Sequence, residues 1–307
     1  MINSPGISIV IVSYNVSGYL DQCIHSLLLQ TNIEVEIIVV DNNSSDGTVE
    51  FLKKKYPTVK VIANKENTGF SAGNNTGIHE ATKDLILLLN PDTELPEKEI
   101  LEKIRAYMIN TPDTGILAPM LLNTDGTFQL SFWDFPKVKD ILLELFYLHR
   151  IQKKQAPALL SPIEGAAGAA LCLSKEFADK LGGLDPDIFW MEDIDLCYRA
   201  TRLGKQVIYN PDIKIIHHGG KSSADNYSIS IPNQVLSKIK YFRKNGTQLQ
   251  FIASNILSFI TILSRIIAFA ILSLSLNKVY TLKLKAYCST LIHYFHYNFA
   301  GKREIIR

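Results

Sequence analysis

Four short apolar runs, separated by segments with helical periodicity, restrict what the first half of this 307-residue chain can fold into. The runs are rich in β-branched residues and cover residues 7–12, 35–40, 59–63 and 85–89. Nearly continuous apolar strands bounded by turn residues are typical of a parallel sheet that helices cover on both faces. The pattern therefore predicts an α/β fold.

The segments between these runs carry helix formers with apolar residues three and four positions apart, over residues 19–30, 48–55 and 98–110. Ser44, Ser45 and Asp46 precede the second of these helices and can cap it. In the second half, the pattern predicts a short helix around residues 141–148, a buried strand over 168–173, and helices over 174–182 and 193–203.

Composition argues against several classes of protein. The apolar share of 47% and the charged share of 20% are those of a globular chain. The net charge of +2 comes from Lys and Arg residues spread along the sequence, so we expect no nucleic-acid partner. The four cysteines form no C-x-x-C pair and fit a reducing compartment. The first residues lack the pattern of a secretory signal, so we expect a cytoplasmic protein.

The C-terminal part has a different character. Residues 251–276 are rich in Ile, Leu and Phe, but Arg265 lies near the centre, where a charge is costly in a membrane span. An interfacial or docked helix is therefore favoured over a span, and the basic and aromatic tail over 278–307 is typical of a membrane-surface segment. The alternative is packing on the catalytic domain or on a second subunit. We expect a catalytic domain over residues 1–245 and a helical, membrane-associating segment over 246–307.

Polar residues follow two of the predicted strands directly. Asp41 ends the second strand and opens a polar turn, where ligands of open α/β sheets bind, and its carboxylate could accept a hydrogen bond from a pyrimidine N–H. Ser45 and Asp46 are better explained as turn and cap residues. After the third strand, residues 67–77 combine glycines with amides, which allow close approach to an anionic or sugar ligand. The spacing is neither that of a dinucleotide fingerprint nor that of a P-loop.

The fourth strand ends in Asn90 and Asp92, and a hard cation that neutralises a diphosphate prefers such oxygen ligands. Taken alone, the Asn-Pro-Asp segment is better explained as a plain turn. Further on, Glu192, Asp193 and Asp195 crowd together beside Trp190, so one of them could act as a general base while another, Asp195, only caps a helix.

Two adjacent histidines end a predicted strand over residues 213–217. Because neighbours on a strand point to opposite faces, at most one of His217 and His218 would enter a site, and a lone histidine there is more often structural. Since Asp92 needs a second ligand to hold a cation, an imidazole is a plausible partner.

Together these clusters resemble family 2 glycosyltransferases of the GT-A fold, especially bacterial rhamnosyltransferase-like members. The segments that carry the resemblance follow the family's order: residues 8–15, 39–47, 67–77, 90–92, 192–195 and 217–220. The resemblance spans about residues 5–245 of this chain. It implies a nucleotide-diphospho-sugar transferase with a Rossmann-like mixed sheet and flanking helices, followed here by a C-terminal apolar helical appendage.

The resemblance also implies roles for single residues. Asp41 would contact the uracil or thymine base, Asp92 and His217 would hold Mg²⁺ or Mn²⁺, and Asp193 would deprotonate the acceptor. Glu192 would bind or orient the acceptor, and Trp190 would line its subsite. The remaining residues assigned to substrate binding are Ser13, Asn15, Asn67, Gly69, Asn74 and Asn90. Many relatives carry Asp where this chain has Asn90, which implies a weaker hold on the cation.

The function implied is inverting transfer of a sugar, with rhamnose favoured, from a UDP- or dTDP-sugar to a glycan or lipid-linked glycan of a surface polysaccharide. Such an enzyme would lie on the inner face of the cell membrane. No Gln-x-x-Arg-Trp motif is present, which argues against a processive synthase. A non-catalytic nucleotide-sugar-binding protein would not need Asp193. A nucleotidyltransferase should carry Lys or Arg near the N-terminus, yet residues 11–25 contain neither.

Overall fold

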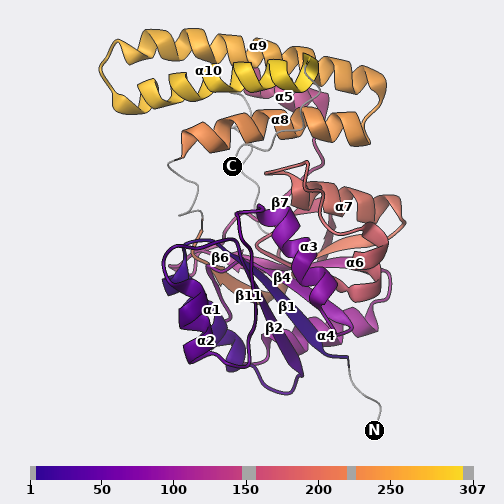
Figure 1. The fold of residues 1–307 in the computed structure, drawn as a ribbon. Coiled ribbons are helices and arrows are strands. Elements are labelled where there is room, and N and C mark those ends of the chain that lie inside the picture. The colour runs from indigo at the N-terminus through magenta and orange to yellow at the C-terminus, as the bar shows by residue number, and fades with distance from the viewer. Residues whose placement is uncertain (1–4, 147–156, 220–225, 300–307) are drawn as a thin grey trace. The chain divides into compact units, whose positions relative to one another are not determined.

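The computed structural model describes residues 5–146, 157–219 and 226–299 (Figure 1). The chain divides into two compact units. The first, here called the sheet unit, comprises Met1–Phe135, Gln155–Pro186 and Glu192–Gly219. The second, the helical unit, comprises Pro136–Lys154, Asp187–Met191 and Gly220–Arg307.

The sheet unit is built on a mixed sheet with the strand order β3-β2-β1-β4-β10-β6-β11-β5, and β8 pairs with β11. Parallel pairing joins β1 (Ile7–Ser13) to β2 (Val35–Asp41) and β4 (Leu85–Leu89), and β2 to β3 (Lys60–Ala63). The antiparallel β10 (Ala170–Ser174) connects β4 to β6 (Thr114–Leu122), which runs parallel to β11 (Gln206–His217). The shorter strands are β5 (Thr93–Glu94), β7 (Phe132–Trp133), β8 (Ser161–Ile163) and β9 (Gly165–Ala166).

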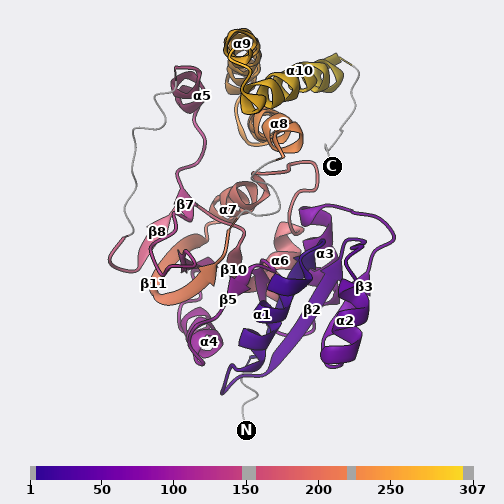
Figure 2. The same ribbon diagram turned by 90° about the vertical axis from the view of Figure 1, so that its left-hand side faces the viewer.

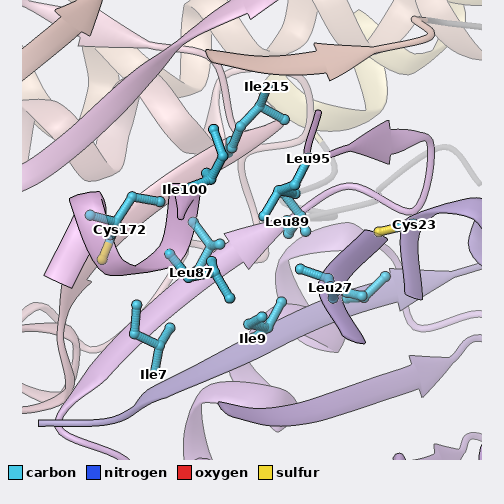
Figure 3. Packing of buried hydrophobic residues seen from close by; sticks show 14 of the residues in the cluster. Ile7, Ile9, Cys23, Leu27, Leu87, Leu89, Leu95, Ile100, Cys172 and Ile215 are labelled. Carbon is cyan, nitrogen blue, oxygen red and sulfur yellow. The ribbon is translucent and has the colours of Figure 1, made fainter. Parts of the chain in front are cut away.

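Helices cover both faces of this sheet. On one face, Ile7, Ile9 and Ile11 of β1 pack with apolar residues of α1 (Ser17–Leu28), α2 (Thr48–Lys55) and α4 (Ile100–Asn110). Figure 3 shows part of this cluster, including Leu27, Leu87 and Ile100. On the other face, Val10 belongs to a cluster with residues of α3 (Phe70–Glu80), α6 (Lys175–Leu181) and α7 (Glu192–Arg202). The alternation along β1 is that of a strand buried on both faces.

The predicted α/β fold is confirmed. The four apolar runs and the predicted helices agree with the structure to within a few residues at each end, but β11 begins at Gln206 rather than at residue 213, and β6 was not predicted. The N-cap of α2 is Gly47, and Asp46 supports this end by accepting a hydrogen bond from the Thr48 N–H at 3.2 Å. The sequence interpretation missed α3, because Gly73 and Gly77 weaken its helical pattern. A Cβ added at Gly77 would lie 2.2 Å from Val10 Cγ1, so glycine is needed where α3 packs on β1.

Replacing Gly77 by alanine is therefore expected to destabilise the protein. The added methyl group must displace Val10 or the helix, and overpacking of this kind costs about 1–3 kcal/mol. Urea unfolding would measure the change. Gly18→Ala is the matched control, since Gly18 also lies in a helix, α1, but has open space around an added Cβ. Equal stability of the two variants would contradict the packing argument.

The helical unit contains α5 (Val138–Leu145), α8 (Tyr227–Asn245), α9 (Gln248–Ser273) and α10 (Lys278–Phe299). Within it, α9 packs against α5, α8 and α10, and Figure 2 views α9 nearly along its axis. This unit takes in α8, which precedes the boundary expected at residue 245, and α5 from the middle of the sequence. The helix predicted around residues 141–148 is α5, although Leu148 lies outside the described residues.

Candidate active site

The site begins at the ends of β1 and β2. The two strands pair in parallel with Ser13 beside Asp41, so both side chains lie at the carboxyl edge of the sheet. Asp41 is 1% exposed, and its Oδ2 accepts a hydrogen bond from the Ser44 N–H at 2.9 Å. Within the described part of the chain, neither Asp41 Oδ1 nor Ser13 Oγ has a hydrogen-bond partner, although both are buried.

Two unpaired buried oxygens at adjacent strand ends are costly, at about 1–3 kcal/mol each. A ligand that donates hydrogen bonds would remove this cost. Asp41 Oδ1 can only accept while the carboxyl is ionised, so it fits a donor such as the ring N–H of a pyrimidine base. The contact between Asp41 and a pyrimidine base stays a prediction.

Asn15 stabilises the turn that follows β2. Its backbone is left-handed, with a φ of 54°, and its N–H donates to Ser44 Oγ at 2.9 Å. Its Oδ1 accepts from the Ser45 N–H at 2.8 Å. In this structure Asn15 therefore positions the turn beside Asp41, and direct contact with a substrate stays a prediction.

Asn42 organises the segment that leads into α3. Its Oδ1 accepts hydrogen bonds from Asn64 Nδ2 at 2.8 Å and Thr68 Oγ1 at 3.0 Å, and its Nδ2 donates to the Gly69 carbonyl at 3.1 Å. Asn67 Oδ1 accepts from the Gly69 N–H at 3.0 Å. Gly69 has a φ of 88°, a conformation that favours glycine. These bonds form a rigid turn ahead of α3.

Asn74 lies inside α3 and is 1% exposed. Its Nδ2 donates to the Phe70 carbonyl one turn earlier, at 3.0 Å. The structure thus gives this amide an intrahelical bond, and the substrate contact predicted for Asn74 remains untested.

A second group forms where β4 and β11 end. His217 Nε2 lies 3.3 Å from Asp92 Oδ1 and 3.4 Å from Asn90 Nδ2. On the other side of the ring, His217 Nδ1 lies 2.7 Å from Gln129 Oε1. Gln129 Nε2 donates to the His217 carbonyl at 3.1 Å and to Asn123 Oδ1 at 3.0 Å, which leaves Gln129 Oε1 as the acceptor for the ring.

This arrangement assigns the proton on the imidazole. Because Gln129 Oε1 must accept, Nδ1 carries a proton, and the neutral ring then points the Nε2 lone pair at the Asp92 carboxylate. Two acceptors 3.3 Å apart repel each other unless a second ring proton or a cation lies between them. Asn90 Oδ1, also buried, has no hydrogen-bond partner among the described residues.

A divalent cation fits this donor set. The described residues contain no cluster of three or more His, Cys, Asp or Glu side chains that could hold a metal, so the protein would supply few ligands. Mg²⁺ and Mn²⁺ bind in this way, through one or two protein groups together with substrate phosphates and water. Asp92 and His217 would hold the ion, and Gln129 would orient the histidine.

His218 points elsewhere, as the alternation of the strand predicts. Its Nδ1 lies 3.0 Å from Thr124 Oγ1, and its ring centroid lies 5.7 Å from that of Tyr19. The structure therefore favours His217 over His218 as the metal ligand.

His217→Ala is expected to raise the Mn²⁺ concentration for half-maximal activity at least tenfold, because one of two protein ligands is lost. His218→Ala, which removes a neighbouring ring of the same type, should leave that concentration nearly unchanged. Titrating each purified variant with Mn²⁺ would compare them. A larger effect of His218→Ala than of His217→Ala would show that His217 is the wrong choice of metal ligand.

The third group contains Asp193, in the first turn of α7. Its Oδ2 accepts a hydrogen bond from the Gly168 N–H at 2.8 Å, and its Oδ1 accepts from the Ile194 N–H at 2.7 Å. The side chain keeps some contact with solvent, but desolvation by the surrounding protein raises the pKa of Asp193 to about 6, against the lowering effect of these bonds. A carboxylate with a pKa near the working pH suits a general base.

Gly168 and Ala169 connect this carboxylate to the second group. The Asn90 N–H donates to the Ala169 carbonyl at 2.9 Å, while the neighbouring Gly168 binds Asp193. A Cβ added at Gly168 would lie 3.6 Å from the ring of Phe70, at the start of α3. The structure thus brings Asn90, Asp193 and the N-terminus of α3 around one short segment.

The other residues of the acidic cluster have different places. Asp195 is fully buried and pairs with Arg199 Nε at 2.7 Å, and Arg199 also donates to the carbonyls of Leu181 and Gly183. Asp195 is thus part of a structural ion pair. Glu192 begins α7. Trp190 belongs to the helical unit, is 39% exposed and has a φ of 85°, and its acceptor subsite stays a prediction.

Sequence reasoning missed Gln129, Asn42 and Gly168 as site residues. Gln129 lies in an irregular aromatic segment, 88 positions before His217, and no local pattern links the two. Asn42 was visible as part of the polar turn after β2, but its partners lie after the next strand.

Comparison with known proteins points to the same family as the sequence resemblance. Residues 8–180 match the family model described as glycosyl transferase family 2. An N-acetylglucosaminyl-diphospho-decaprenol L-rhamnosyltransferase of Mycobacterium tuberculosis is 24% identical over 70% of this chain and 76% of its own length. A low-salt glycan biosynthesis hexosyltransferase, Agl10 of Haloferax volcanii, is 26% identical over 82% of this chain and 81% of its own.

Among solved structures, the mannosyltransferase PcManGT from Pyrobaculum calidifontis, in complex with GDP-Man and Mn²⁺, aligns with a TM-score of 0.58 at 16% identity. The alignment covers 98% of this chain and 89% of that one. GalNAc-T7 with UDP, GalNAc and Mn²⁺ aligns with a TM-score of 0.53 at 14% identity, and the alignment covers 59% of its length. These likenesses confirm the predicted GT-A fold.

Proposed function

This chain belongs to glycosyl transferase family 2 and is a glycosyltransferase, and we propose that it inverts the anomeric carbon and depends on Mg²⁺ or Mn²⁺. The observation that carries the proposal is the position of Asp193. Its carboxylate, with a pKa of about 6, is bound to Gly168, and the adjacent Ala169 is bound to Asn90 at the end of β4. Two adjacent residues, Gly168 and Ala169, thus link the proposed base to the end of β4, which carries the candidate cation ligand Asp92.

In the proposed reaction, Asp193 accepts the proton of the acceptor hydroxyl as its oxygen attacks the anomeric carbon. The bond from that carbon to the diphosphate breaks in the same displacement, which inverts the configuration. A bound divalent cation supplies charge neutralisation for the diphosphate. Asp92 and His217 would hold this ion, and Ser13 and Asp41 would receive the base of the donor.

For the substrates, we propose a UDP- or dTDP-sugar as donor, with rhamnose favoured, and a lipid-linked glycan as acceptor. The unpaired Asp41 Oδ1 supports a pyrimidine base. The name of the mycobacterial relative, which combines rhamnose transfer with a diphospho-decaprenol acceptor, supports the sugar and the lipid. A lipid-linked acceptor would bring the enzyme to the cytoplasmic face of the cell membrane as a peripheral protein.

A panel of nucleotide sugars tests the donor. Purified enzyme with Mn²⁺ should hydrolyse or transfer from dTDP-rhamnose or a UDP-sugar and be inactive with GDP-mannose. Asp41→Asn should raise the donor KM by roughly 10–100-fold, because a charged hydrogen-bond acceptor is worth about 1.5–3 kcal/mol. Turnover of a GDP-sugar alone, or an unchanged KM in the variant, would contradict the assignment of Asp41.

A further inference from the structure

Helix α9 has the reverse of the polarity expected for a helix in water. Its buried positions include the polar residues Ser254, Ser258, Thr261 and Arg265. Its exposed large apolar residues include a stripe with positions three and four residues apart and exposed fractions of 37–76%: Leu249, Ile252, Ile256, Ile260, Leu263, Ile267 and Ile271. A soluble helix turns its apolar stripe inward and its polar face outward. We call these seven exposed residues the α9 stripe.

The exposed surface of α9 carries no charge. Arg265 is the one charged residue in the sequence of α9, and it is only 7% exposed. Its Nη2 donates to the Glu144 carbonyl at 2.6 Å, at the C-terminal end of α5. The guanidinium therefore stabilises that helix end and does not reach toward solvent along the stripe. From Leu249 to Leu272, over roughly 36 Å, the exposed residues of α9 are uncharged, and apart from Gln250 they are apolar.

This chemistry indicates what covers the stripe. A seam that pairs with a second copy in water is usually flanked by exposed charged residues that set register and partner choice. The exposed surface of α9 has none. Polar residues turned inward and branched aliphatic residues turned outward are instead typical of a helix in contact with hydrocarbon. The occupant that fits is a lipid bilayer.

The neighbours of α9 argue against a membrane span, although α9 is long and apolar enough to cross one. The Glu144 carbonyl binds Arg265 near the middle of α9, and the Glu144 carboxylate pairs with Lys238 of α8. In a spanning orientation this ion pair would lie inside the hydrocarbon core, where charges are costly.

Helix α10 leads to the same conclusion. It runs alongside α9, with the Phe259 and Tyr294 rings 5.4 Å apart and the Phe269 and Tyr287 rings 5.7 Å apart (Figure 1). Lys283 of α10 lies 5.8 Å from the Phe269 ring, and Lys285 is exposed. A helix with these charges suits the interface, where lysines attract anionic lipid headgroups.

We propose that α9 is a monotopic membrane helix, which lies in the plane of the bilayer surface with the α9 stripe inserted into the hydrocarbon. The inference deepens the proposed function, since a lipid-linked acceptor requires a membrane, but its observations come from the helical unit and from none of the residues assigned to catalysis. Arg265 and the polar side of α9 stay against α5, α8 and α10, so no charged group enters the hydrocarbon.

Flotation of the purified full-length chain with lipid vesicles tests the insertion. The chain should float with phosphatidylcholine vesicles, and more strongly when a quarter of the lipid is phosphatidylglycerol. Ile256→Glu combined with Ile267→Glu should weaken vesicle binding at least tenfold. Ile109→Glu is the control, because Ile109 is 48% exposed, close to Ile256 at 55%, but lies in α4 of the sheet unit, and this variant should float like the wild type. Circular dichroism would verify that each variant is folded.

Spin labels test the orientation. The exposed cysteine is first removed by Cys288→Ser. Nitroxides are then attached to single cysteines introduced by Ile252→Cys, Ile260→Cys or Ile271→Cys, and all three should report the same immersion depth. A depth that passes through a maximum along α9 and returns to the surface would show a span. The proposal would be overturned if the wild-type protein did not float with vesicles. It would also be overturned if the protein formed a dimer in water that the double substitution dissociates. Vesicle binding is measured without substrates, so an inactive donor panel with intact flotation would refute the proposed function alone.

Discussion

Asp193→Asn is expected to lower the transfer rate by roughly 10²–10⁴-fold while leaving donor binding nearly unchanged. Asparagine keeps the shape of the side chain and an oxygen that can accept from the Gly168 N–H, but it cannot take a proton from the acceptor hydroxyl. Turnover with saturating substrates and calorimetric donor binding would separate the two effects. Near-normal turnover would refute the assignment of the base.

The pH dependence offers a second measurement on the same residue. Since desolvation raises the pKa of Asp193 to about 6, activity should rise with pH through about 6, as the carboxyl ionises. The residual activity of Asp193→Asn should lack this rise. Asp195→Asn is an unsuitable control because it breaks a buried ion pair, so the wild type in the same buffers serves instead.

The raised pKa also links Asp193 to stability. The folded-state pKa of about 6 lies above the ordinary value of 3.8, so the folded protein holds this proton more tightly than the unfolded chain does. The contribution of Asp193 is therefore favourable at low pH and is lost as the pH rises from about 4 to about 6. The melting temperature of the wild type should therefore fall, relative to that of the non-titrating Asp193→Asn variant, as the pH rises from about 4 to about 6. A difference between the two that does not change with pH would contradict the raised pKa.

Removal of divalent cations is expected to have the other large effect. EDTA should lower activity at least 100-fold, because the diphosphate would leave without charge neutralisation, a contribution of several kcal/mol. Mn²⁺ or Mg²⁺ added in excess should restore the rate. EDTA loaded beforehand with Mg²⁺ is the control for effects of the chelator itself. Full activity in metal-free EDTA would exclude the role proposed for Asp92 and His217.

Binding of the cation can be followed apart from catalysis. Electron paramagnetic resonance of free Mn²⁺ would report how much of the ion the protein takes up. Gln129→Leu, which keeps the side-chain volume but removes the acceptor for His217 Nδ1, should weaken Mn²⁺ uptake by roughly 10–100-fold. Unchanged uptake would mean that His217 does not need Gln129 to face Asp92.

Much of the sheet unit was predictable from local sequence. The runs that became β1, β2 and β4 are apolar on both faces, and a parallel sheet under helices is one of few places where such strands are stable. Their ends also located the candidate site, since Asp41 and Asn90 follow them directly. The order of the clusters along the chain indicated the family, which the match over residues 8–180 confirmed.

The helical unit shows where local patterns stop being informative. The sequence indicated that Arg265 makes a span unfavourable, but not that its guanidinium would bind the Glu144 carbonyl, 121 positions away. It also could not indicate that α8 and α5 would pack with α9. The periodicity of apolar residues shows which face of a helix is apolar, but it does not show which other segment that face contacts.

The sequence by itself thus determined the strands β1 to β4, the fold class and the carboxylates at strand ends, because burial on two faces and ionisation are properties of residues and their near neighbours. Only the tertiary structure decided which groups act together. It brought Gln129 within hydrogen-bonding distance of His217 and Gly168 within hydrogen-bonding distance of Asp193, and it turned the polar side of α9 inward. The two pairings join residues that are 88 and 25 positions apart in the sequence, and each forms because a buried polar group must find a partner wherever the fold provides one.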